Sequence, residues 1–215
     1  MPRGWTRIAV GTVAVLALAV GAYRTVGVEL SRPHRDSTST PPVQTSPSGP
    51  TGSAAGGGAT SALRVVHSPG LVTDDAHLSP GQCHARTATS GDPLPDPACT
   101  PGAVDPAVTQ ATIDSTICRS GYTATVRPPA SDTGRWKIRT YVFYGLDTST
   151  RGEYDHLVPL ELGGSNTTSN LWIEAGSIPN PKDKVENRLH EQVCAGDMSL
   201  AAAQQAIATD WTTVH

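Results

Sequence analysis

The chain has 215 residues, a length typical of one or two domains, with 37% hydrophobic and 16% charged residues. Its 21 glycines and 18 prolines indicate long loops, yet they are too few for a collagen or a wholly disordered chain. The formal net charge of -3 excludes a protein that attracts nucleic acid by bulk positive charge, and one Phe with five Tyr argues against an aromatic platform for single strands.

The first 30 residues have the pattern of an export signal. Arg3 and Arg7 precede fifteen uncharged, mostly apolar residues, 8–22, and small residues end this run. The run is shorter than the roughly 20 residues that span a bilayer, so it predicts a secretory signal peptide. An uncleaved signal-anchor is the alternative, with residues 26–28 extending the span. Either way we expect the rest of the chain outside the cytoplasm, secreted or held to the cell membrane only by this segment.

A linker follows at residues 31–62. From residue 36 to 61, 20 of 26 residues are Ser, Thr, Pro or Gly. Such a segment has almost nothing to bury, so we expect a tether without chemistry of its own.

Four cysteines predict two disulfides in an exported chain. They are Cys83, Cys99, Cys118 and Cys194. Their spacing lacks the close pairs of a zinc site, and three connectivities remain open. Because Cys194 lies late in the chain, at least one bridge should tie the C-terminal helices to the region before residue 120.

Residues 63–121 read as a loop-rich wrap pinned by disulfides, because turn residues are frequent and periodicity is weak. Within this wrap we expect one short helix over residues 108–117. Residues 122–127 alternate apolar and polar before two prolines, which predicts a strand. Residues 135–144 predict a strand or a short buried helix.

Two helices close the chain. The first begins at Asn180-Pro181, a natural helix start, and ends at Gly196. The second begins near Ser199, and both have apolar residues at helical spacing. These residues are Val185, Leu189 and Val193 in the first helix, and Leu200, Ala203, Ile207 and Trp211 in the second. Strands before helices predict an α+β fold.

The segment that carries chemistry runs from Glu153 to Asn187. An adjacent Asp155 and His156 follow a short strand-like run, and residues 170–173 predict a second strand before the capped helix. An imidazole at a strand end can act as a general base, and a neighbouring carboxylate can bind a hard divalent cation. These groups suit the hydrolysis of a phosphodiester.

The run Asp-His-Leu-Val-Pro-Leu at 155–160, the Gly pair at 163–164 and Asn-Leu-Trp at 170–172 resemble the HNH endonucleases of the ββα-metal (His-Me finger) superfamily. More loosely, the chain from Cys99 to Trp211 is similar to exported actinobacterial HNH-like proteins. The resemblance implies a ββα-metal core with C-terminal helices in an HNH-like nuclease domain over residues 122–215.

The resemblance also assigns roles. His156 matches the general base, Asp155 a metal ligand, and Asn170 the central asparagine that braces the loop and hence the imidazole. The third motif position falls on Asn180 or, as a second candidate, on Asp183, and the expected cation is Mg²⁺, with Mn²⁺ or Zn²⁺ as alternatives. Three cations in the first turns of the helix are candidates for phosphate contacts: Lys182, Lys184 and Arg188.

Two functions remain open. The first is an exported, divalent-metal-dependent endonuclease that hydrolyses DNA, with RNA as a further candidate substrate. The second is a non-catalytic envelope or interaction domain built on the same scaffold. Nine Lys/Arg against nine Asp/Glu between residues 119 and 195 argue against strong binding of DNA. The third metal ligand discriminates between these functions. The non-catalytic domain is favoured if neither Asn180 nor Asp183 points at the Asp155-His156 site. No protein partner is evident from the sequence.

Overall fold

The computed structural model describes residues 62–215, which belong to one compact unit. The predicted signal segment, 1–30, and the linker up to residue 61 lie outside the described residues. In the described part of the chain, no helix combines the length and the hydropathy that a membrane crossing needs.

Helices and small sheets mix along the chain, which confirms the predicted α+β class. The strands are β1 (Arg64–Val65), β2 (Arg86–Thr87), β3 (Pro93–Leu94), β4 (Ala103–Val104), β5 (Gly152–His156) and β6 (Leu171–Ala175). The α-helices are α1 (Tyr122–Val126), α2 (Ala130–Phe143), α3 (Lys182–Ala195) and α4 (Leu200–Asp210). The 3-10 helices are η1 (Ile113–Ser115), η2 (Leu160–Leu162) and η3 (Trp211–Thr213).

The wrap over residues 63–121 consists mainly of loops. Its strands are two residues long, with β1 parallel to β4 and β2 antiparallel to β3. The prediction of a helix over residues 108–117 is wrong, because only the three residues of η1 are helical there. The Thr112 hydroxyl accepts from the amide of Thr109 at 2.8 Å and donates to the carbonyl of Ala107 at 2.9 Å. Such local side-chain bonds compete with the helical backbone pattern.

The strand predicted over residues 122–127 is also wrong, because this segment forms helix α1. Gly121 precedes it with a φ of 82°, and Arg127 is extended before Pro128, so the helix ends there. No described strand pairs with these residues, and six residues are too few for their periodicity to decide the element type.

Residues 135–144 fall in helix α2, apart from its C-cap residue, so the helical alternative is the correct one. The helix is longer than predicted because it begins directly after two prolines, with Pro129 extended at its N-cap. Asp132, Trp136 and Thr140 are buried at a spacing of four residues, as expected of one face of a helix.

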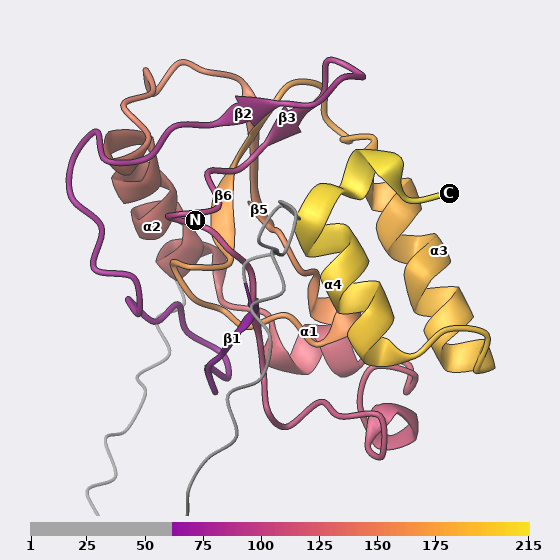
Figure 1. Cartoon of the computed structure of the whole chain (residues 1–215). Coiled ribbons are helices and arrows are strands. Elements are labelled where there is room, and N and C mark those ends of the chain that lie inside the picture. Colours follow the sequence, from indigo (N-terminus) through magenta and orange to yellow (C-terminus); the bar gives the residue numbers. More distant parts are fainter. Residues whose placement is uncertain (1–61) are drawn as a thin grey trace, which may run out of the picture. The chain divides into compact units, whose positions relative to one another are not determined.

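An antiparallel pair of strands, β5 and β6, carries the residues of interest. Gly152 lies opposite Ala175 and His156 opposite Leu171. Helix α2 packs against β6, and the first residue of α3, Lys182, hydrogen-bonds to β5. Figure 1 shows the two strands between α2 and the yellow C-terminal helices.

Helices α3 and α4 confirm the predictions for the C-terminal region. Gly196 ends α3 with a φ of 82°, and the Ser199 hydroxyl caps α4 by accepting from the amide of Ala202. The apolar faces of the two helices contribute to the largest core cluster. Its buried members from this region are Leu189, Val193, Leu200, Ala203, Ile207 and Trp211.

Both predicted disulfides are present. Cys83 bonds to Cys99 within the wrap, and Cys118 bonds to Cys194 at the end of α3. The second bridge therefore ties the C-terminal helices to the wrap, as predicted. Two disulfides and no free cysteine are typical of proteins that fold in an oxidising compartment outside the cytoplasm.

Candidate functional site

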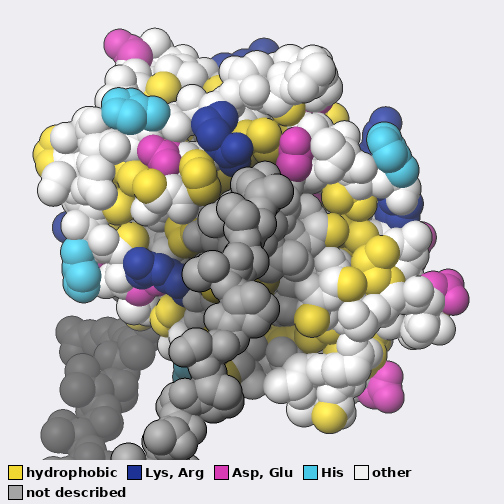
Figure 2. Space-filling view, in the orientation of Figure 1, with side chains coloured by type: hydrophobic (Ala, Val, Ile, Leu, Met, Phe, Trp, Pro, Cys, Tyr) yellow, Lys and Arg dark blue, Asp and Glu magenta, His cyan; other side chains and the backbone are white. Residues whose placement is uncertain are grey.

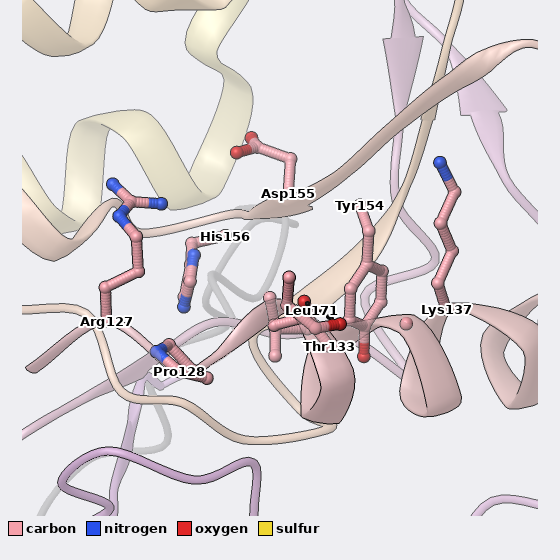
Figure 3. A pocket seen from close by; sticks show the side chains of 10 residues that line it. Arg127, Pro128, Thr133, Lys137, Tyr154, Asp155, His156 and Leu171 are labelled. Carbon is pink, nitrogen blue, oxygen red and sulfur yellow. Dashed lines mark hydrogen bonds between the residues drawn. The ribbon is translucent and has the colours of Figure 1, made fainter. Parts of the chain in front are cut away.

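Asp155 and His156 are adjacent in β5, but their side chains lie on opposite faces of the strand pair. Figure 3 shows the Asp155 carboxylate on one side of the strand and the His156 ring on the other, on the same side as Tyr154. This divergence follows from the alternation of side chains along a strand. The two residues therefore meet different environments.

The His156 side chain is nearly buried and is held by one hydrogen bond. Its Nε2 lies 2.9 Å from Oδ1 of Asn166, in the loop between η2 and β6. Burial lowers the pKa of His156 to about 4, against a smaller opposing effect of Asp155. The imidazole is therefore neutral at neutral pH, which is the protonation state of a general base.

Asn170 braces the loop that follows His156. Its Oδ1 accepts from the amides of Val158 at 2.9 Å and Ala103 at 3.2 Å. Its Nδ2 donates to the carbonyls of Val158 at 2.9 Å and Ser165 at 3.0 Å. All four bonding positions of this fully buried amide are used, so Asn170 has no free atom for a substrate.

A pocket of about 360 Å³ opens on the His156 side of the strands. Two cationic residues line it, Arg127 just before α2 and Lys137 within α2. Figure 3 shows Arg127 beside His156 and Lys137 beyond Tyr154. The Lys137 ammonium donates to the carbonyl of Gly152 at 3.0 Å, at the opposite end of β5 from His156. The other lining residues are Pro128, Ala130, Thr133, Gly134, Asp155 and Leu171. Arg127 is exposed and has no ion-pair partner among the described residues, so its charge is available to an anion.

Charges of both signs are scattered over the face of the molecule that Figure 2 shows. No broad basic surface forms on this face, in agreement with the balanced charge of the sequence. An anionic ligand would therefore depend on local cations such as those of the pocket.

On the other side of the strands, Asp155 belongs to a buried ionic cluster. The Lys182 ammonium donates to Oδ2 of Asp155 at 2.6 Å, to the carbonyl of His156 at 2.7 Å, and to the carboxylate of Glu186. These three bonds use all its hydrogens, and the side chain is completely buried. Burial alone would raise the pKa of Asp155, but the Lys182 charge holds it below its usual range.

Glu174, in β6, adds a third carboxyl to this cluster. It is 1% exposed, and neither of its oxygens has a hydrogen-bond partner. Burial raises its pKa to about 9, and the negative charge of Asp155 acts in the same direction. Glu174 is thus protonated at neutral pH, while burial raises the pKa of Glu186 to about 7.

The geometry tests whether the predicted ligands suit a divalent cation. Mg²⁺ needs about six oxygen ligands. The Lys182 ammonium already occupies the position in front of Asp155 and bonds one of its oxygens. A second cation there would face a fixed positive charge, so the arrangement around Asp155 does not fit a divalent metal.

The two candidates for the third ligand lie at the start of α3. Oδ1 of Asn180 accepts from the amide of Asp183 at 3.2 Å, and Nδ2 donates to Glu153. The oxygen of Asn180 is therefore engaged in capping the helix. Asp183 is partly buried, and its pKa is raised by burial and by the nearby charge of Asp155.

The predicted phosphate-binding cations have three different environments. Lys182 is enclosed in the ionic cluster, so no phosphate reaches it in this structure. Arg188 donates to the carbonyl of Val214 at 2.7 Å and thereby holds the chain end. Lys184 is exposed and remains available.

One group of potential metal ligands occurs among the described residues. The ligand atoms of Cys118, His190 and Cys194 all lie within 4.8 Å of one another. The two sulfurs form a disulfide, however, and metal binding by cysteine needs thiolates. This group could hold a metal only in a reduced chain.

The chain matches no protein-family model, no curated protein and no solved structure. The class that fold and site define is a disulfide-bonded α+β protein with a neutral histidine in a pocket lined by cations.

Several important residues were not predicted. Arg127 and Lys137 precede β5 in the chain, and only tertiary packing places them along the same pocket as His156. Asn166 gave no periodic signal. Glu186 lies four residues after Lys182, the spacing of helical ion pairs, so this signal was present.

Proposed function

We propose that the protein is an exported hydrolase of phosphodiester bonds in nucleic acid, with His156 as its general base. The observation that carries the proposal is the neutral His156 imidazole in a pocket that also presents the exposed Arg127. A base that takes a proton from water and a cation that stabilises the charge on the phosphate both promote hydrolysis of a phosphodiester.

The proposed reaction assigns one task to each group. His156 takes a proton from a water molecule, whose oxygen attacks the phosphorus. A new P–O bond forms, the bond to the leaving oxygen breaks, and that oxygen takes up a proton from solvent. Arg127 binds the phosphate oxygens and stabilises the charge that grows on them.

The resemblance to HNH endonucleases supports this proposal independently of the pocket. β5, β6 and α3 follow one another in the order that the resemblance implies. The part of the resemblance that concerns a divalent cation at Asp155 lacks this support, because Lys182 occupies that position. We therefore assign no step to a metal at Asp155.

A cleavage assay on the full, disulfide-bonded chain tests the proposal. Plasmid DNA and single-stranded RNA are incubated with wild type, His156→Ala and His84→Ala, in EDTA, Mg²⁺ or Mn²⁺. The side chain of His84 is exposed and lies outside the pocket, so it is a matched control. We expect cutting by wild type and the control, and a loss of about 10²- to 10⁴-fold in His156→Ala.

The metal arms of this assay separate two mechanisms. Cutting in EDTA supports the mechanism without a metal at Asp155. Cutting only with Mg²⁺ or Mn²⁺ would show that a metal displaces Lys182 or binds elsewhere. No cutting by folded wild type in any condition would overturn the hydrolase and favour a non-catalytic envelope domain, for which the near burial of His156 is the supporting observation.

A further inference from the structure

Asn166 is a buried amide that the proposed reaction does not use. It is 1% exposed and contacts three segments of the chain through its side chain. Nδ2 donates to the carbonyl of Ser68 at 3.0 Å and to that of Val126 at 2.8 Å, while Oδ1 lies 2.9 Å from Nε2 of His156.

These contacts determine the orientation of the amide. Carbonyl oxygens only accept hydrogen bonds, so the NH₂ group must face Ser68 and Val126. Oδ1 consequently faces His156. The backbone of Asn166 is fixed as well, since its carbonyl accepts from the amide of Thr73 and the hydroxyl of Ser68, both at 2.8 Å.

The orientation of Asn166 in turn determines which nitrogen of His156 carries the proton. Oδ1 can only accept, so Nε2 must be the N–H of a neutral imidazole, and Nδ1 keeps its lone pair. None of the described residues hydrogen-bonds to Nδ1, and this atom is not fully buried. Nδ1 is therefore the nitrogen that remains for a water molecule.

We propose that Asn166 is a positioning residue that holds His156 as the Nε2–H tautomer and thereby presents Nδ1 as the basic nitrogen. This inference rests on the proposed function. A fixed donor–acceptor pair also restricts rotation of the ring, so the base is held in one orientation before substrate arrives.

Nitrogen-15 NMR of the His156 ring in the wild-type chain tests the tautomer directly. We expect Nε2 to carry a directly bonded proton in contact with Asn166, and Nδ1 to have the shift of an unprotonated ring nitrogen. A proton on Nδ1, or a mixture of both tautomers, would overturn the proposal. This measurement needs no substrate and no variant.

The variant Asn166→Leu, of similar volume but without an acceptor, tests the consequence for the reaction. We expect kcat to fall about 10- to 100-fold with KM little changed, since a loosely held base loses part of its contribution. Ser165→Ala is the control, because this neighbouring buried hydroxyl bonds to the carbonyl of Val66 and not to His156. Circular dichroism establishes that both variants are folded.

The two failures are distinguishable. If wild type cuts nothing, the proposed function is lost, while the tautomer is still decided by NMR. If wild type cuts and folded Asn166→Leu cuts at the same rate with an unchanged ring spectrum, the positioning role of Asn166 is wrong. If Asn166→Leu does not fold, the wild-type spectrum alone decides.

Discussion

The two faces of the β5–β6 pair place neighbouring residues in different electrostatic environments. On one face, His156 is neutral, bonds to a neutral amide and borders a pocket that contains exposed charge. On the other, Asp155 is ionised and bonds to a completely buried ammonium. The two environments are those of successive residues in one strand, whose side chains point to opposite faces.

The comparison indicates what each face can do. A neutral imidazole with a free lone pair can accept a proton without first losing a partner, although burial disfavours the charged form that results. A carboxylate already bonded to an ammonium must first lose that partner before it can bind another cation. We infer that the His156 face is suited to chemistry, whereas the Asp155 face joins α3 to the strands.

The largest effect that this comparison predicts is on stability. Lys182→Met should lower the free energy of unfolding by about 3–5 kcal/mol, because Asp155 and Glu186 are left without their partner. Urea denaturation of the full chain measures the change.

Lys184→Met is the matched control for this prediction, because Lys184 is exposed two residues later in the same helix. It should change stability by less than about 0.5 kcal/mol. Equal stability of Lys182→Met and wild type would contradict the structural role of the cluster. Adding Asp155→Asn and Glu186→Gln to Lys182→Met should recover part of the loss, since no uncompensated charge remains.

The next effect concerns Glu174 and depends on pH. Its pKa is raised from 4.5 to about 9 in the folded chain, so the folded state holds a proton that the unfolded state releases between these values. The stabilising contribution of that proton is complete below pH 4.5 and is lost as pH rises through 9. Glu174→Gln keeps a neutral side chain at every pH and removes this dependence.

We therefore expect Glu174→Gln to match wild type near pH 4 and to be more stable by about 1–3 kcal/mol at pH 8. Thermal or urea unfolding at both values measures this. Glu153→Gln, on a neighbouring, half-buried carboxyl of β5, serves as the comparison. A constant difference between Glu174→Gln and wild type across the range would show that Glu174 is ionised in the folded chain.

The sequence predicted the C-terminal half of this arrangement better than the rest. Capping residues and apolar spacing located α3 and α4, because local signals determine where helices begin and end. The predictions for residues 122–144 were wrong in part, because a short run of aromatic and β-branched residues is compatible with both a strand and a buried helix.

The candidate site was predicted as single residues rather than as an arrangement. The sequence predicted His156 and Asp155 as parts of one site, but alternation in a strand places their side chains on opposite faces. The long-range contacts carry no local signal: Lys182 to Asp155 spans 27 residues, and Asn166 to Ser68 spans 98. Such pairs depend on tertiary packing.

A smaller effect tests the pocket. Arg127→Ala should lower kcat/KM about tenfold, mainly through KM, because an exposed cation contributes to phosphate binding. The fall in affinity with salt should also become less steep. Arg119→Ala, an exposed arginine outside this pocket, is the control. An identical loss in both variants would indicate general attraction by charge instead of a phosphate site at His156.

The smallest expected effect is the response of the reaction to mild acid. A histidine with the ordinary pKa of 6.5 would lose most of its basic form by pH 5.5, whereas burial holds the pKa of His156 at about 4. We expect kcat/KM, which reports the free protein, to stay nearly constant from pH 8 to 5.5 and to fall only as pH approaches 4. Because the pKa of His156 is lower in the folded than in the unfolded chain, the neutral imidazole stabilises the fold above pH 6.5. This contribution is lost as pH falls toward 4, so unfolding must be measured in parallel. A tenfold fall in kcat/KM between pH 6.5 and 5.5 in a folded sample would show that His156 is more hydrated than its face of the strands indicates, and the contrast between the two faces would then weaken.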